Sequence, residues 1–461
     1  MLFSSITFIY FFIPFVLLYF LIPKKWKNAF LLIVSLFFYF SGEPIYVTLL
    51  LISSLSDWLH GLYIEPRRGT RKAKVALISS IVINLLLLGF FKYTDFFITT
   101  INTLFALDIP LLGIELPIGI SFFTFQTMSY TIDVYRGEAR AQKNLATFAT
   151  YVCLFPQLIA GPIVRYTDVE NEIENRKHGV SKFATGVRRF CAGLGKKVLI
   201  ANLLGELCSN FLASDEKSVL FYWINTLAFS LQIYFDFSGY SDMAIGLGHI
   251  FGFNFPENFN YPFISRSITE FWRRWHMTLG SWFRDYVYIP LGGNRVSKGK
   301  WIRNIAIVWM LTGFWHGAQW NFVLWGVMFG ILLAIEKLFL GKWLERSPNV
   351  IKHIYTCFIV LLSFAVFNAN GLVGVANDFK GLFGAGNVPL VTAETIYNLK
   401  SYAVILIIAI IGCTPLPKKV WKTIPAAINT VLEPVMAVTI LIVSTAFIIN
   451  GSFNPFLYFR F

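Results

Sequence analysis

Residues 305–335 read IAIVWMLTGFWHGAQWNFVLWGVMFGILLAI and contain no Lys, Arg, Asp or Glu. A stretch of this length exceeds the ~20 residues that one helix needs to cross a bilayer, and polar residues at 317–321 predict an interruption. If a helix begins at Ile305, His316 lies roughly 17 Å into a hydrocarbon core about 30 Å thick. An ionisable side chain at that depth usually faces a polar cavity. His316 is therefore expected either to have a function or to bond to a neighbouring helix.

The remainder of the chain has the composition of a polytopic membrane protein. Of its 461 residues, 56% are apolar and 14% are charged, whereas soluble domains carry about 25% charged residues. No polar stretch is long enough for a separate soluble domain, so we expect one all-α membrane domain over residues 1–461. The five cysteines are scattered without a CxxC pair, which argues against a disulfide framework or a zinc site.

Apolar runs give the expected helices. Spans are predicted at 4–22, 75–91, 198–212, 354–367, 403–412 and 434–450. The shorter runs 29–40 and 46–55 are expected to form a hairpin, and the run 220–250 is apolar with an unusual number of polar residues. The run 116–135 is too polar to face lipid on all sides, so it is expected to line the interior. The run 151–163 contains two prolines, a glutamine and a glycine, and is expected to be re-entrant or broken.

The net charge of +14 reflects membrane topology and not nucleic-acid binding, because the basic residues fall in loops between apolar runs. Cytoplasmic loops are enriched in Lys and Arg. The clusters at 24–27, 67–74 and 417–422 are therefore expected in the cytoplasm. Both ends of the chain are then extracytoplasmic, and the tail 451–461 emerges on the outer face.

Four stretches of mixed aromatic and polar residues stand out. They are FPQLIAGPI (155–163), YFDFSGYSDMA (234–244), FWRRWH with SWFRDY and IPLGGN (271–276, 281–286 and 289–294), and GFWHGA (313–318). Together and in this order they resemble the membrane-bound O-acyltransferase family, in particular its bacterial branch of alginate and peptidoglycan O-acetyltransferases. The resemblance covers roughly residues 110–335.

The resemblance implies a transmembrane helical bundle with re-entrant or broken helices around a central tunnel, in the inner membrane of a bacterium. It implies a cytoplasmic thioester donor, for which acetyl-CoA is expected, and an extracytoplasmic polysaccharide acceptor. An extracytoplasmic acetyltransferase with a hydrolase fold is the expected partner. By match to the family motifs, His316 is expected to be the catalytic histidine and His276 the second functional one. No permanently bound cofactor or metal is expected.

The chemistry of acyl transfer suits these residue types. A hydroxyl acceptor needs a base, and the ordinary pKa of histidine, about 6.5, fits that role. Burial disfavours a charged imidazole, which would keep His316 neutral. The tetrahedral intermediate needs hydrogen-bond donors. Candidate donors and tunnel residues are Trp315, Gln319, Asn321 and, in the stretch 234–242, Ser238 and Tyr240. Asp236, flanked by two phenylalanines, is expected to orient a histidine or to cap a helix.

Arginines next to His276 have two interpretations. Arg273, Arg274 and Arg284 could bind the phosphates of a coenzyme A donor, because guanidinium groups form strong charge-assisted bonds to phosphate. Alternatively, they only follow the positive-inside rule and extend toward the membrane surface.

The last six residues, FLYFRF (456–461), contain a tyrosine between aromatic neighbours. They resemble the terminal motif of bacterial polymer-acylation systems, in which a tyrosine carries the acyl group as an ester. Tyr458 is therefore expected to be an acyl relay activated by His316, with an interfacial aromatic belt as the alternative. Two other functions stay open. One is D-alanyl transfer to teichoic acid from a carrier-protein thioester, and the other is transport, because ionisable groups at the midplane also mark transport paths.

Overall fold

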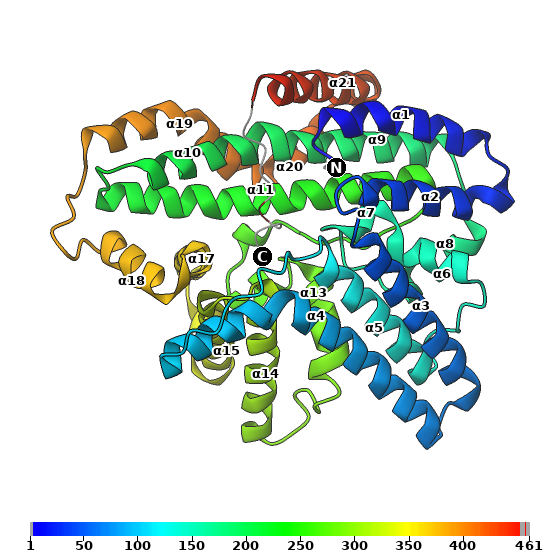
Figure 1. Ribbon diagram of the computed structural model, residues 1–461. Coiled ribbons are helices and arrows are strands. Elements are labelled where there is room, and N and C mark those ends of the chain that lie inside the picture. Colours follow the sequence, from blue (N-terminus) through cyan, green and yellow to red (C-terminus); the bar gives the residue numbers. More distant parts are fainter. Residues whose placement is uncertain (1–2, 452–456, 458–461) are drawn as a thin grey trace. The chain divides into compact units, whose positions relative to one another are not determined.

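The computed structural model describes residues 3–451 and residue 457. Within these residues every regular element is a helix, as Figure 1 shows. Six helices are long and apolar enough to cross a membrane: Val47–Arg67, Arg71–Phe105, Trp320–Arg346, Asn349–Asn368, Ala393–Gly412 and Ala426–Asn450. The prediction of an all-α polytopic membrane protein is therefore confirmed. The chain divides into two compact units, Met1–Phe190 with Tyr240–Pro256, and Cys191–Gly239 with Glu257–Phe461.

The first unit contains the N-terminal helices. They are α1 (Ile6–Leu21), α2 (Lys27–Phe40), α3 (Val47–Ile64), α4 (Arg71–Phe105), α5 (Ile120–Arg136), α6 (Leu145–Cys153), α7 (Phe155–Leu158), α8 (Tyr166–Asn175) and most of α9 (Val180–Gly195). Hydroxyl caps explain two of the helix starts. Ser5 accepts the N–H of Phe8 at 3.2 Å before α1, and Thr70 accepts the N–H of Ala73 at 3.3 Å before α4.

Two helices of the first unit are longer than the apolar runs that predicted them. Helix α3 continues through Asp57, whose carboxylate accepts bonds from Ser80 at 2.6 Å and Asn84 at 2.8 Å. Helix α4 continues through Lys92, which bonds to the hydroxyl of Ser121 at 3.2 Å. The ends predicted at positions 55 and 91 are therefore wrong. A polar residue does not end a helix when neighbouring helices supply its hydrogen bonds.

The two unusual runs of the first unit behave as predicted. Helix α5 buries nearly all of its residues and so lies in the interior. The run 151–163 is broken, because α6 ends at Cys153 and α7 is a single turn. Prolines and polar residues in that run prevent one continuous helix.

The second unit contains most of α11 and the later helices. They are η3 (Lys196–Ala201), α10 (Asn202–Ala213), α11 (Val219–Phe251) up to Gly239, η4 (Pro262–Ile264), α12 (Ile268–Trp272), α13 (Met277–Phe283), η5 (Arg284–Tyr288), α14 (Lys298–His316), α15 (Trp320–Ile335), η6 (Glu336–Leu340), α16 (Gly341–Arg346), α17 (Asn349–Asn368), α18 (Gly371–Leu382), α19 (Ala393–Gly412), α20 (Leu416–Thr423) and α21 (Ala426–Asn450). Helices α18 and α20 were not predicted, because each is too short to register as a span.

Helices α14 and α15 form a tightly packed pair, side by side in Figure 1. Helix α14 ends at His316 and α15 begins at Trp320, so the predicted interruption is confirmed. The close approach depends on glycine, because a Cβ atom at Gly313 would lie 2.5 Å from the carbonyl oxygen of Phe322. The pair therefore presents His316 from a rigid support.

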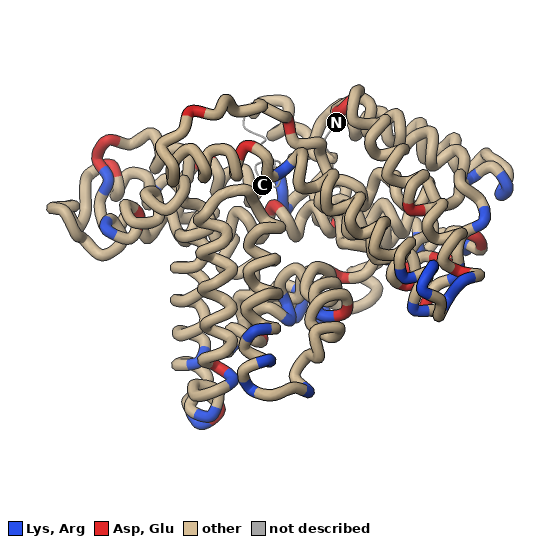
Figure 2. The backbone as a smooth tube through the Cα atoms, turned by 60° about the horizontal axis from the view of Figure 1, so that its bottom comes forward, with Lys and Arg blue, Asp and Glu red and all other residues tan. Residues whose placement is uncertain are grey.

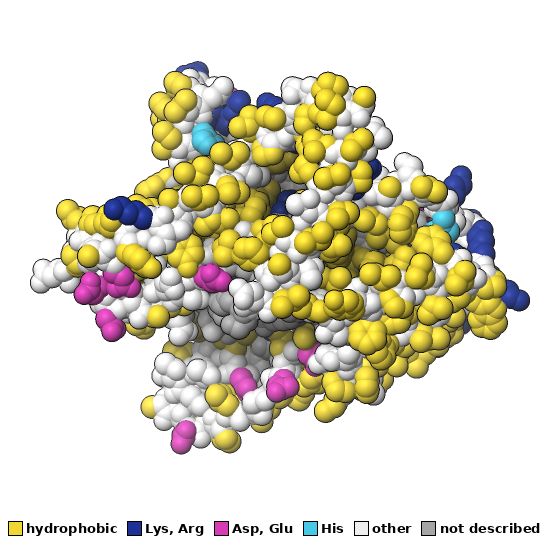
Figure 3. All heavy atoms as spheres, turned by 90° about the horizontal axis from the view of Figure 1, so that it is seen from above, with side chains coloured by type: hydrophobic (Ala, Val, Ile, Leu, Met, Phe, Trp, Pro, Cys, Tyr) yellow, Lys and Arg dark blue, Asp and Glu magenta, His cyan; other side chains and the backbone are white. Residues whose placement is uncertain are grey.

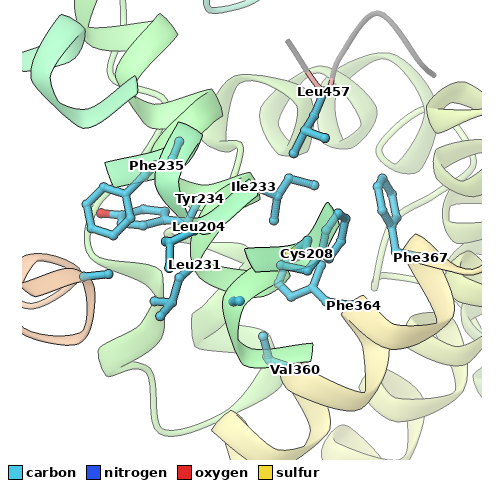
Figure 4. Close-up of a cluster of buried hydrophobic side chains, with 14 of the residues drawn as sticks. Leu204, Cys208, Leu231, Ile233, Tyr234, Phe235, Val360, Phe364, Phe367 and Leu457 are labelled. Atoms are coloured by element: carbon cyan, nitrogen blue, oxygen red, sulfur yellow. The ribbon is translucent and has the colours of Figure 1, made fainter. Parts of the chain in front are cut away.

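A buried apolar cluster joins α10, α11, α12, α15 and α17 in the second unit. Figure 4 shows part of it, with Ile233, Phe364 and Phe367 around Leu457. Aromatic rings dominate the cluster near α15, where the ring centroids of Trp325 and Phe367 lie 5.1 Å apart. Large rings with few rotatable bonds give this part of the interior a defined packing.

The outer surface matches a membrane environment. Figure 3 shows apolar side chains over much of the face seen from above, with basic side chains in separate clusters. Along the α14–α15 pair, Met310 and Ile331 are exposed, as expected for lipid-facing positions. Lys and Arg gather near one end of this pair in Figure 2, where α14 begins and η6 follows α15.

Candidate active site

His316 is the last residue of α14, and its side chain is buried. Its Nδ1 lies 2.7 Å from the carbonyl oxygen of Thr312, one helical turn earlier. A carbonyl can only accept, so Nδ1 carries the proton in the neutral ring and Nε2 keeps a lone pair. The backbone of α14 thus fixes the tautomer that a general base requires.

Aromatic rings enclose His316. Its ring centroid lies 5.1 Å from that of Trp315, 4.8 Å from that of Trp325 and 5.6 Å from that of Phe367. Rings at these distances exclude water, which strengthens every electrostatic interaction at the site.

His276 occupies a backbone position that holds it in place. It directly precedes α13 with a φ angle of 44°, in the left-handed region, where side chains other than glycine are uncommon. Its Nδ1 lies 3.0 Å from Oδ1 of Asn258. The same Oδ1 accepts the backbone N–H and the hydroxyl of Thr278 at 3.3 and 2.9 Å. Because a backbone N–H can only donate, the shared atom is the amide oxygen, and His276 donates from Nδ1.

Burial lowers the pKa of His276 well below its usual range, and positive charge on His316 would lower it further. The two histidines also share a neighbour. The centroid of Trp315 lies 5.7 Å from that of His276 and 5.1 Å from that of His316. The structure therefore brings the two predicted histidines together around Trp315, and the hydrogen-bond partner of each ring accepts from its Nδ1.

A cavity of about 640 Å³ is lined by residues of α12, α13 and α14 in the second unit; neither histidine lines it, but Met277, which follows His276, and Thr312 do. Three cationic residues on its wall, Arg273, Arg284 and Lys337, are exposed. The buried Thr312, whose carbonyl holds His316, also lines the cavity, and so does Trp272. The cavity thus has positive charge and an aromatic wall, and it extends to Thr312, whose carbonyl accepts from His316.

The three predicted arginines separate in the structure. Arg273 and Arg284 line the cavity, and Arg284 also forms an ion pair with Asp285 at 2.6 Å. Arg274 is not among the lining residues; it pairs with Glu270 at 2.9 Å and donates to the carbonyl of Asn260 at 3.1 Å. Lys337 is a cationic wall residue that the sequence analysis missed, because it lies beyond every motif.

The predicted oxyanion donors also differ in availability. The side-chain nitrogen of Asn321 donates to the carbonyls of Phe367 and Ala369 at 3.2 and 2.9 Å, which fastens α15 to α17. Gln319 is exposed and precedes α15. The hydroxyl of Ser238 is buried and has no hydrogen-bond partner within residues 3–451 and 457.

Tyr240 belongs to the first unit, and Tyr458 lies outside the described residues. Asp236 forms an ion pair with Lys197 at 2.7 Å. An additional donor missed by sequence reasoning is the indole N–H of Trp325, which is buried beside His316 and has no partner in the described part of the chain. Among the described residues, no three His, Cys, Asp or Glu side chains gather as metal ligands.

Comparison with known proteins places this site in a family. The model of the membrane-bound O-acyltransferase family matches residues 87–367. A probable alginate O-acetylase, AlgI, of Pseudomonas aeruginosa is 43% identical over 392 residues, which cover 84% of this chain and 75% of the relative. AlgI of Pseudomonas putida, also named as probable, is 38% identical over 492 residues, covering both chains fully. The peptidoglycan O-acetyltransferase of Helicobacter pylori is 34% identical over 427 residues, covering 85% and 81%. The matched region contains both histidines.

Proposed function

Because this chain belongs to the membrane-bound O-acyltransferase family, we propose that it moves an acetyl group from a cytoplasmic thioester to an extracytoplasmic polysaccharide. The family match supports O-acyl transfer, and the relatives named for alginate and peptidoglycan acetylation support a polysaccharide acceptor. We place it in a bacterial inner membrane, which the bacterial sources of the relatives support, with both chain ends outside the cytoplasm, which the charge pattern supports.

One observation carries the mechanism: the Thr312 carbonyl accepts the proton-bearing Nδ1 of His316, so the lone pair of the neutral ring is on Nε2, where a base needs it. In the proposed step, Nε2 removes the proton of an acceptor hydroxyl as its oxygen attacks the thioester carbonyl. The new C–O bond forms, the C–S bond breaks, and the proton passes to the departing thiolate. Positioned general bases contribute about 10²–10⁴-fold to such reactions.

The cavity has the properties that an acetyl-CoA donor requires. The exposed Arg273 and Lys337 in its lining suit phosphate groups, and the wall containing Trp272 suits the uncharged arm that carries the thioester. The buried N–H of Trp325 and the hydroxyl of Ser238 suit an oxyanion, because a buried donor without a protein partner can bond to a substrate.

The variant Arg273→Gln tests whether Arg273 binds the phosphates of the donor or only follows the positive-inside rule. We expect Arg273→Gln to raise the KM for acetyl-CoA about 10-fold with little change in kcat, because one charge-assisted bond is worth about 1.5–3 kcal/mol and this residue is exposed. Arg274→Gln is the matched control, since its neighbouring guanidinium pairs with Glu270 instead of lining the cavity. If the KM for acetyl-CoA changed equally in both variants, Arg273 would not be a phosphate-binding residue.

The acyl group is proposed to reach the outer face on Tyr458, from which a hydrolase-fold partner passes it to the polymer. The described neighbour supports this relay. Leu457 is buried in the same cluster as Phe367, whose ring centroid lies 5.6 Å from that of His316. A segment entering that cluster could therefore present a hydroxyl to the base.

Mass spectrometry of the peptide around Tyr458 tests the whole proposal. After incubation of purified protein with acetyl-CoA, we expect an added acetyl group on Tyr458 that is absent from His316→Ala and from Tyr458→Phe. Polymer acetylation that continues unchanged in Tyr458→Phe would rule out the relay. If no acetyl group is found on any variant, a carrier-bound aminoacyl donor is the next substrate to supply.

A further inference from the structure

The carboxylate of Asp236 has a different partner on each oxygen. Its Oδ1 lies 2.7 Å from Nζ of Lys197, and its Oδ2 accepts the backbone N–H of Leu457 at 3.0 Å. The Asp236 and Lys197 side chains are 3% and 4% exposed. The buried pair thus holds Leu457, which lies 221 residues further along the chain than Asp236.

The local backbone brings the two charged residues together. Lys197 lies on η3, a π-helical turn, and such turns occur frequently at functional sites. One turn after Asp236, a Cβ atom at Gly239 would lie 2.8 Å from the carbonyl oxygen of Gly193 and 3.2 Å from the backbone nitrogen of Lys197. Only glycine permits this approach, so the short side chain of Asp236 can reach the ammonium group.

Leu457 is held by its side chain as well as by its backbone. The side chain is 5% exposed and belongs to the apolar cluster of the second unit. Figure 4 shows it pointing into the cluster between Ile233 and Phe367. Two independent contacts, one polar and one apolar, therefore fix this position of the chain.

The same contacts border both histidines. The ring centroid of Phe367 lies 5.6 Å from that of His316. The residue after Asp236 is Phe237, whose ring centroid lies 4.7 Å from that of His276. Leu457 thus shares its cluster with a ring that lies against His316, and Asp236 directly precedes a ring that lies against His276.

A buried ion pair is weak evidence for a stabilising role, because replacing it with a well-packed apolar pair of similar volume often leaves the stability of the protein unchanged or higher. An apolar pair cannot accept a hydrogen bond, however. Asp236 therefore supplies an acceptor for the backbone N–H of Leu457, which an apolar residue could not do.

We propose that Lys197 and Asp236 are positioning residues that hold Leu457 in the apolar cluster whose ring of Phe367 lies against His316. Lys197 orients the carboxylate through Oδ1, and Oδ2 of Asp236 fixes the backbone N–H of Leu457. The inference rests on the proposed relay in one respect: Tyr458 follows Leu457 directly, and transfer to its hydroxyl requires a fixed register.

Three double variants of the full-length protein in detergent test whether Lys197 and Asp236 hold Leu457. Lys197→Met/Asp236→Leu keeps volume and removes the acceptor. Lys197→Gln/Asp236→Asn is neutral but keeps an amide oxygen that can accept the N–H of Leu457. The matched control is Arg189→Met/Asp242→Leu, which removes another ion pair involving α11, at 2.9 Å.

Hydrogen–deuterium exchange of the Leu457 amide, read in overlapping peptides, is the readout. We expect exchange at least 10-fold faster in the Met/Leu variant of the Lys197 pair, and near the unaltered rate in the Gln/Asn variant and in the Arg189 control. Acetylation of Tyr458 should fall at least 100-fold in the same Met/Leu variant, while the KM for acetyl-CoA stays within 2-fold.

Unchanged exchange in the Met/Leu variant of the Lys197 pair would overturn the proposal, and so would equal acceleration in the Arg189 control. The relay itself fails by a separate result, namely the absence of acetyl on Tyr458 in the unaltered protein. The exchange measurement does not depend on that result, so the two failures are distinguishable.

Discussion

Replacing His316 with glutamine is expected to lower the rate of acyl transfer by about 10²–10⁴-fold, with the KM for acetyl-CoA nearly unchanged. Glutamine keeps a side-chain N–H that can bond to the carbonyl of Thr312, which now accepts from Nδ1 of His316 at 2.7 Å. It has no basic nitrogen, so the variant removes the lone pair and preserves most of the packing. Initial rates with radiolabelled acetyl-CoA measure the effect.

His353→Gln is the matched control for His316→Gln. His353 is an exposed histidine on α17 in the same unit, and its Nδ1 lies 3.3 Å from the carbonyl oxygen of Ser265. We expect full activity in this variant. If His316→Gln kept more than a tenth of the normal rate, another group would have to be the base.

Replacing Asn258 with leucine is expected to lower the free energy of unfolding by at least about 3 kcal/mol. Three donors now converge on its amide oxygen: Nδ1 of His276, and the backbone N–H and hydroxyl of Thr278. Each buried donor that is left unsatisfied costs about 1–3 kcal/mol. Thermal unfolding in detergent, monitored by circular dichroism, measures the loss. A change below 1 kcal/mol would show that water replaces the amide.

The variant Asn258→Asp keeps an oxygen that accepts from His276 and adds a negative charge beside the ring. His276 is neutral in the folded protein, because burial lowers its pKa, but in the unfolded chain it takes a proton below about pH 6.5. The stability contributed by this group is therefore present above pH 6.5 and falls by up to about 1.4 kcal/mol per unit as the pH drops. An aspartate beside the ring raises the pKa of His276, so this acid-dependent decline should shrink in the variant. A steeper decline would contradict the assignment.

The helices could be predicted from the sequence where hydropathy decides them. The break after His316 follows from Gly317, Gln319 and Asn321 within an apolar run, and the structure has it at that place. The length of α4 could not be predicted, because the continuation through Lys92 depends on Ser121, which lies on another helix. Hydropathy reports each residue alone and not its partner.

The candidate site, like the helices, could be predicted from the sequence only in part. The motif histidines could be identified in the sequence, but Asn258 lies in irregular chain 18 residues before His276 and belongs to no motif. Arg273 and Arg274 are adjacent and chemically identical, so only their surroundings separate them. One signal was available: Glu270 stands four residues before Arg274, a spacing at which opposite charges pair on a helix.

The end of α14 at His316 has an electrostatic consequence. The last carbonyl groups of a helix lack intrahelical partners, and together with the aligned peptide dipoles they place partial negative charge at its C-terminal end. His316 lies in the last turn of this 19-residue helix. The imidazole gains positive charge only after it has taken a proton from the acceptor. The potential at this helix end therefore stabilises the site most at the moment of transfer and least in the resting enzyme.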